Sequence, residues 1–157
     1  MTTTAQDAKE IRSELKAIGL NSKDVAVRSK IYSMGSSIDV FIKSEKALAL
    51  KKEIEAIAAN HEKIDHDDIT GEILCGGNHF IFVSIGWEFE RSLMEKNEST
   101  IMGVIEQARE KVNQIMEYCG TKFFYDSRTS QFCTSGYLGN SYREADQFKW
   151  VLLRGTY

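Results

Sequence analysis

Residues 25–42 read VAVRSKIYSMGSSIDVFI, and the alternation of apolar and polar side chains along this stretch decides the fold. Two runs of period two, separated by SMGS at 33–36, are typical of a β-hairpin with a short turn. One face of this hairpin is aliphatic, and we expect neighbouring helices to cover it. That face carries Val25, Val27, Ile31, Ile38, Val40 and Ile42.

Helices are predicted on both sides of the hairpin. Residues 4–18 place apolar side chains at helical spacing, with Thr4 as the N-cap and Asp7 as its reciprocal partner. Gly19 is a natural stop for this helix. Ser44 is the expected N-cap of a second helix, which runs to about Ala59.

The rest of the chain gives weaker signals. The tight-turn sequence Gly76-Gly77-Asn78 lies between two short strand candidates, and Gly120 follows the clearest helical periodicity. A Ser-, Thr- and Gly-rich stretch without clear periodicity, at 126–147, is predicted to be a long functional or mobile loop. We expect strands at 72–75 and 80–85, a helix at 99–118, and strands at 122–125 and 148–153.

These elements predict an α+β fold, with an antiparallel or mixed sheet and about three helices packed on one side. A length of 157 residues fits a single domain, so we predict one domain over 1–157. No apolar run approaches the roughly 20 residues that span a bilayer, and the N-terminus is polar from the start. The odd number of cysteines, three, fits a reducing compartment. We therefore expect a cytoplasmic protein without a membrane partner.

Residues 11–42, IRSELKAIGLNSKDVAVRSKIYSMGSSIDVFI, form a recognisable pattern. A helix with I-R-x-x-L-K, a strand with V-R-S and a Ser/Gly turn into S-S-I-x-V resemble the N-terminal signature of a large polyvalent protein-associated domain family. GEILCGGN, at 71–78, is similar to a segment of longer members. The resemblance covers roughly residues 8–85, whereas 86–157 resembles no family. Members usually have prolines near Gly19 and Ser44, and this chain has no proline.

The resemblance implies a biological context. Domains of this family are carried by phages and conjugative plasmids and are thought to act against host defences. A chain of this kind is expected to be a phage- or mobile-element-encoded accessory protein in the host cytoplasm. Its expected role is non-enzymatic, with a host protein or nucleoprotein complex as the partner that it blocks.

The basic and aromatic face of the hairpin is the first candidate binding site. Cations can neutralise phosphates and aromatic rings can stack on bases, so the alternative function is a single-stranded nucleic-acid-binding module. The net charge of −3 weighs against that alternative. The candidate residues are Arg28, Lys30, Tyr32, Phe41 and Lys43.

The loop at 126–147 is the second candidate, because Tyr, Arg and Asn are favoured in protein contact surfaces. We expect affinity to be concentrated in a few Tyr and Arg side chains. The candidate residues of this loop are Tyr137, Asn140, Tyr142 and Arg143.

Two further segments carry chemistry-bearing side chains. The turn at 32–37 could offer backbone N–H groups and hydroxyls to an anion, although a plain hairpin turn is favoured because no phosphate-loop pattern is present. A metal-dependent hydrolase is a third function, with ligands drawn from His61, Asp65, His66, Asp67, Asp68 and Glu72. Because no metal-binding spacing or catalytic triad order is present, we predict no catalytic residues, no metal and no cofactor.

Overall fold

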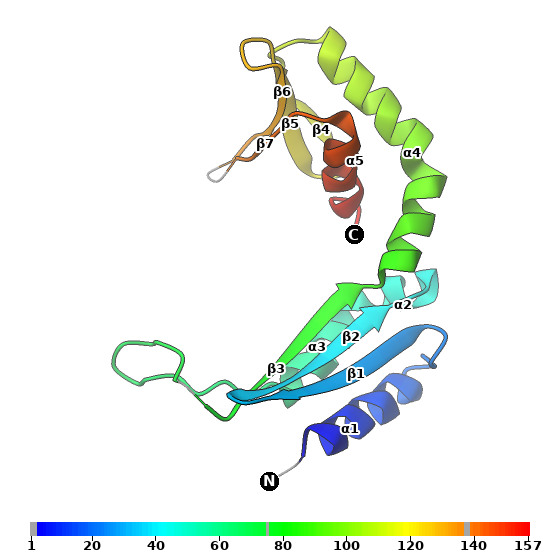
Figure 1. The fold of residues 1–157 in the computed structure, drawn as a ribbon. Helices are drawn as coiled ribbons and strands as arrows, with labels where there is room; N and C mark the ends of the chain where they lie inside the picture. Colours follow the sequence, from blue (N-terminus) through cyan, green and yellow to red (C-terminus); the bar gives the residue numbers. More distant parts are fainter. Residues whose placement is uncertain (1–2, 75, 137–138) are drawn as a thin grey trace. The chain divides into compact units, whose positions relative to one another are not determined.

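The computed structural model describes residues 3–74, 76–136 and 139–157. The α+β class is confirmed, since the described residues contain five helices and two sheets, with 42% helix and 28% strand. The chain divides into two compact units, an N-terminal unit (Met1–Phe89) and a C-terminal unit (Glu90–Tyr157). Each unit has its own sheet (Figure 1). The expectation of a single domain stays a prediction.

The N-terminal unit contains the predicted hairpin. Strands β1 (Val25–Tyr32) and β2 (Gly35–Ile42) pair antiparallel, with Tyr32 opposite Gly35. Ser33 and Met34 therefore form the two-residue loop, which is shorter than the four-residue turn that the sequence suggests. The hairpin itself is confirmed at the predicted positions, because its alternation and turn are local signals.

The aliphatic face of the hairpin is covered only in part. Val25 and Val27 are buried, and so are Ile38, Val40 and Ile42 on β2. Ile31 was expected on the same covered face, but 81% of its surface is exposed. That expectation was wrong for the tip of the hairpin, since α1 contacts β1 but the last residues of β1 are exposed.

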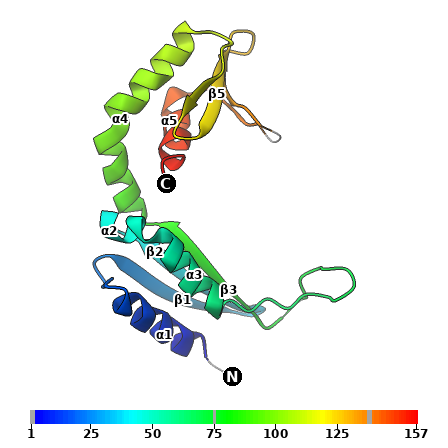
Figure 2. The same cartoon turned by 180° about the vertical axis from the view of Figure 1, so that it is seen from behind.

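Three helices belong to the N-terminal unit: α1 (Thr4–Ala17), α2 (Glu45–Ala49) and α3 (Lys51–His61). Helices α1 and α3 pack against each other and against the sheet, so they cover the same face (Figure 2). The second predicted helix is interrupted at Leu50, and its Ser44 cap is confirmed by a bond from the Ala47 N–H. The cap of α1 is Thr3, one residue before the predicted Thr4.

Strand β3 (Asn78–Ile85) completes the sheet in the order β1-β2-β3. It pairs parallel with β2, so α2 and α3 form part of the crossover between two parallel strands. The predicted strand at 72–75 is wrong for its described part, which has a single bridge at Ile73. Residue 75 lies outside the described residues.

The C-terminal unit begins within α4 (Trp87–Glu110). An antiparallel sheet follows in the order β4-β5-β6-β7, and α5 (Ala145–Arg154) comes last. The strands of this sheet are β4 (Met116–Tyr118), β5 (Thr121–Asp126), β6 (Gln131–Thr134) and β7 (Ser141–Tyr142). The predicted strand at 122–125 is therefore confirmed within β5.

Three other expectations for this part of the chain were wrong. The long helix covers 87–110 instead of 99–118, because Asn113 adopts φ 60° and its N–H bonds to the Tyr125 carbonyl of β5. The predicted strand at 148–153 is part of α5, since a short apolar run does not distinguish a buried strand from a buried helix. The stretch at 126–147 contains β6 and β7, so it is not one long loop.

The core of the C-terminal unit is aromatic. The rings of Phe132 and Phe148 stack with centroids 5.0 Å apart and an interplanar angle of 6°. Phe123 lies against Phe148 at 5.2 Å, and all three side chains are fully buried. Ile101 and Ile105 of α4 are also fully buried, so helix and sheet in this unit each contribute a buried face.

Candidate binding face

In Figures 1 and 2, no helix formed by the described residues of the N-terminal unit lies against one face of its sheet. Strand alternation puts Ile38, Val40 and Ile81 on the buried side and their chain neighbours on the other side. We call this second side the open face. By register and alternation it carries Ala26, Arg28, Lys30, Tyr32, Ser37, Asp39, Phe41, Phe80, Phe82 and Ser84.

Aromatic rings occupy two neighbouring strands of the open face. Phe80 and Phe82 are two residues apart on β3, and their rings stack with centroids 6.1 Å apart. Phe82 exposes 54% of its surface. On β2, the Phe41 ring is half-buried and lies under the guanidinium of Arg28, 5.7 Å from its carbon atom.

Several of the predicted basic side chains are already engaged. Lys30 pairs with Asp39 on the adjacent strand, with Nζ 2.7 Å from Oδ2. Lys43 follows β2, and its ammonium donates to the Ser22 carbonyl at 3.1 Å. The hydroxyl of Tyr32 donates to the Ser36 carbonyl at 3.2 Å. Arg28 therefore contributes charge to the open face, while Lys30 is largely neutralised by its partner.

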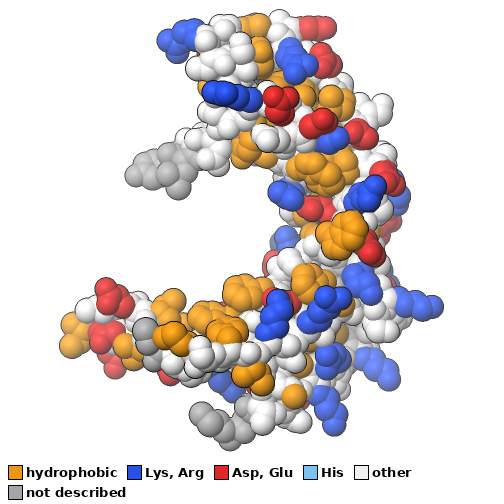
Figure 3. Space-filling view, in the orientation of Figure 1, with side chains coloured by type: hydrophobic (Ala, Val, Ile, Leu, Met, Phe, Trp, Pro, Cys, Tyr) orange, Lys and Arg blue, Asp and Glu red, His pale blue; other side chains and the backbone are white. Residues whose placement is uncertain are grey.

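Apolar side chains extend beyond the sheet at the hairpin tip. Ile31, Tyr32 and Met34 are exposed there. Figure 3 shows hydrophobic side chains in a row over this sheet, with Lys and Arg side chains beside them. Soluble proteins seldom leave contiguous apolar patches of this kind uncovered unless they contact something.

Sequence reasoning missed Phe80 and Phe82 as site residues. The alternation of HFIFVSI placed both on one face of a strand, and that signal was available. What the alternation did not give was the parallel pairing of β3 with β2, which puts Phe82 opposite Asp39 and diagonal to Phe41. The candidate set is thus larger than predicted, because a third strand contributes to the same face.

The candidates of the 126–147 stretch belong to the other unit. Tyr137 lies outside the described residues. Asn140 bonds to Thr134 through its backbone, and the half-buried Tyr142 ring lies 5.6 Å from the core residue Phe148. Tyr142 is therefore a packing residue in part, while Arg143 is exposed.

The predicted metal ligands around residues 61–72 are not brought together. The Asp67 carboxylate accepts bonds from the backbone N–H groups of Thr70 and Ile69, which lower its pKa. His66 lies near the Gly71 carbonyl. The Asp67 carboxylate therefore stabilises the turn that follows it in the chain, as is usual for Asp in turns.

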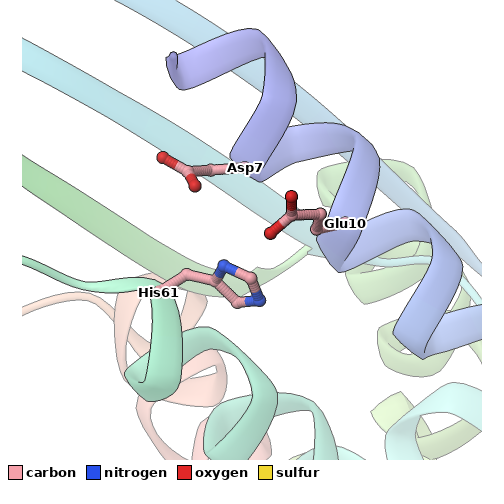
Figure 4. Close-up of side chains that lie close together, drawn as sticks. All are labelled: Asp7, Glu10 and His61. Carbon is pink, nitrogen blue, oxygen red and sulfur yellow. The ribbon is translucent and has the colours of Figure 1, made fainter. Parts of the chain in front are cut away.

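His61 instead lies near two carboxylates of α1. Ligand atoms of Asp7, Glu10 and His61 all lie within 4.8 Å of one another, and Figure 4 shows Glu10 turned toward the imidazole. His61 Nε2 also lies 2.7 Å from Glu14. Sequence reasoning missed Asp7 and Glu10 as ligands, because Asp7 was interpreted as a capping partner and nothing in the local pattern brings α1 to His61.

The turn at 32–37 directs a hydroxyl into the protein. Ser36 Oγ lies 2.7 Å from His79 Nδ1, and Ser37 is buried. The turn has the two-residue hairpin geometry described above, and its use as an anion site stays untested.

No family model matches this chain, and no significant match was found among curated proteins or solved structures. Among the described residues, no helix is long and apolar enough to cross a membrane. The site geometry is therefore the evidence on which a function can be argued.

Proposed function

We propose that this protein is a non-enzymatic binding protein that contacts a partner protein through the open face and blocks it sterically. The observation that carries the proposal is the exposed Phe82, stacked on Phe80 beside the Arg28–Phe41 pair. Aromatic residues and arginine are the types enriched in protein interfaces and in their energetic hot spots.

Charge favours a protein over nucleic acid as the partner. A strand-binding surface needs cations that are free to contact phosphates. Lys30 on the open face is paired with Asp39, and Lys43, just after β2, is bonded to a backbone carbonyl. The whole chain carries a net charge of −3, which also disfavours binding to a negatively charged nucleic acid.

A groove next to the open face supports a partner with acidic groups. It lies between α1 and the edge strand β1, has a volume of about 530 Å³, and has Arg12, Lys16 and Arg28 in its wall. Arg12 donates to the Val27 carbonyl of the edge strand at 2.7 Å. Lys16 and Arg28 would complement carboxylates on a partner segment that reaches around the sheet edge.

The likeness to the large polyvalent protein-associated domains adds a biological context to this proposal. A phage- or plasmid-encoded accessory protein that acts in the host cytoplasm would meet host defence proteins or nucleoprotein complexes. The likeness supports this context, and the open face supports the binding mode.

Site-specific photo-crosslinking tests the proposal. A photoreactive phenylalanine analogue at position 82 samples the open face, and the same group at Lys52 samples the exposed side of α3. In a bacterial lysate, we expect a discrete protein adduct from position 82 and none from position 52. Excess unlabelled wild-type protein should remove that adduct, whereas excess Arg28→Ala/Phe82→Ala protein should not. Identical adducts from both positions would contradict a face-specific interaction.

Single-stranded nucleic acid is a second candidate, favoured by the parallel stack of Phe80 and Phe82, because sequence-tolerant strand binding uses such rings. A labelled oligonucleotide at low salt decides between the two. Binding that weakens steeply with salt and is lost in Phe82→Ala would replace the protein partner with nucleic acid. An absence of binding at low salt would remove the second candidate.

A further inference from the structure

We infer that the N-terminal unit binds one divalent transition metal of the zinc class, held by Asp7, Glu10 and His61 with His79 as a fourth ligand. The metal would join α1 to the end of α3 and to the start of β3. No reaction is assigned to it, so the inference is independent of the proposed binding face.

The first observation is the convergence of ligand atoms from separate elements. Asp7 and Glu10 lie one turn apart on α1, and His61 is the last residue of α3 (Figure 4). Their ligand atoms lie within 4.8 Å of one another. Two ligands on a tetrahedral zinc ion are about 3.4 Å apart, given bonds of about 2.1 Å. Small side-chain rotations would therefore close the group around an ion.

The second observation is independent and concerns His79. This imidazole is buried, with 6% of the residue exposed, and its Nε2 has no hydrogen-bond partner among the residues that the structure describes. Nδ1 is 2.7 Å from Ser36 Oγ, which fixes the ring orientation. Nε2 lies 3.7 Å from Asp7 Oδ2, and Asp7 is itself only 5% exposed. That separation is too long for a hydrogen bond, but it is close to the spacing of two ligands on one metal.

Burial makes this arrangement costly without a cation. A buried ring nitrogen without a partner and a buried carboxylate each carry a desolvation penalty. A divalent ion bound by both groups would remove the two penalties together. Imidazole with carboxylate is also the donor set that suits zinc and its first-row neighbours, whereas calcium and magnesium prefer oxygen alone.

The remaining contacts resemble the outer shell of a metal site. His61 Nε2 is held by Glu14 at 2.7 Å, so Nδ1 is the nitrogen available for a metal. A carboxylate on the second ring nitrogen is the usual way in which proteins orient a ligating histidine. In the same way, Ser36 Oγ lies beside Nδ1 of His79, so Nε2 is the nitrogen of that ring that is available for a metal.

Zinc titration of the whole chain by calorimetry, after treatment with a chelator, tests the inference. We expect one zinc ion per chain, with affinity reduced at least about tenfold in Glu10→Gln and in His61→Ala. His66→Ala is the matched control, because His66 is an exposed histidine in the loop after α3 and should leave the affinity unchanged. Glu10→Gln keeps the shape of the side chain, and a circular dichroism spectrum unchanged from wild type will show that it folds.

Three results of the titration would contradict the proposed zinc site. Saturation at less than one zinc per chain would overturn the inference. Retention of wild-type affinity in both Glu10→Gln and His61→Ala would overturn it as well, and loss of binding in His66→Ala would assign the ion to the acidic loop instead. Cobalt substitution gives a second readout: a strong visible absorption of tetrahedral cobalt in the wild type, weakened in Glu10→Gln, supports the four-ligand site.

Discussion

The guanidinium of Arg28 lies 5.7 Å above the centre of the Phe41 ring, across the antiparallel pair of strands β1 and β2. It covers one side of a ring that would otherwise be more exposed on the open face. The same two residues contribute to the proposed contact surface, so binding and stability must be measured separately.

Arg28→Ala is expected to lower the stability of the N-terminal unit by no more than about 1 kcal/mol, because an exposed cation–π contact contributes that much at most. Urea denaturation followed by circular dichroism measures the change. The adduct from position 82 should nevertheless be weakened. A loss of several kcal/mol would mean that Arg28 is mainly structural.

Phe148→Ala should destabilise the C-terminal unit by about 3–5 kcal/mol, since it removes a fully buried ring between Phe123 and Phe132. Hydrogen exchange of β5 and β6 measures the effect within that unit. Phe82→Ala is the matched control, because the same ring is removed from an exposed position. If Phe148→Ala and Phe82→Ala accelerated hydrogen exchange in β5 and β6 equally, the assignment of Phe148 to the core of the C-terminal unit would be wrong.

Gly35→Ala should destabilise the pairing of β2 with β3. A Cβ atom built on Gly35 would lie 2.5 Å from the backbone oxygen of Asn78, and φ at this residue is 155°. We expect a loss of about 1–3 kcal/mol, the usual cost of overpacking. Amide exchange in β3 should accelerate, whereas β6 of the other unit serves as an internal reference. Unchanged exchange in β3 would argue against the close approach.

Glu90→Gln should reduce the acid sensitivity of the C-terminal unit. Arg154 donates two bonds to the Glu90 carboxylate, at 2.8 and 3.3 Å, and these bonds hold its pKa below the usual 4.5. A lowered folded-state pKa stabilises the fold above pH 4.5, and this contribution is lost as the pH falls through the folded-state pKa. Denaturation midpoints of wild type and variant should therefore differ at pH 7 and converge in acid. A constant difference at all pH values would exclude this ion pair as the cause.

The positions that local signals could define were predicted well. The hairpin followed from alternation and a short turn, and the Ser44 cap followed from a side chain that bonds three residues ahead. Helix α5 was misinterpreted because six apolar-rich residues fit either a strand or a helix. Its buried residues Phe148 and Leu152 are four apart, a spacing whose meaning became clear only with the phenylalanines of β5 and β6 beside it.

The residues of the candidate sites also divide into those that local alternation predicts and those that only long-range contacts bring together. Arg28, Lys30, Tyr32 and Phe41 share one face because neighbouring residues of a strand alternate, and this could be read from the chain alone. The addition of Phe80 and Phe82 required strand β3 to pair with β2 after a long connection. The meeting of Asp7 with His79 required α1 to pack over that sheet.

The sequence by itself therefore determined the hairpin, the Ser44 cap and the α+β class, because these depend on residues a few positions apart. Only the tertiary structure decided which strand lies beside β2 and which carboxylates lie near His61 and His79. Such contacts join segments more than 40 residues apart, as Ser36 and His79 do. These contacts form when the free energy gained by burying a shared core exceeds the entropic cost of closing a long loop. A short stretch of sequence does not show which of the two is larger.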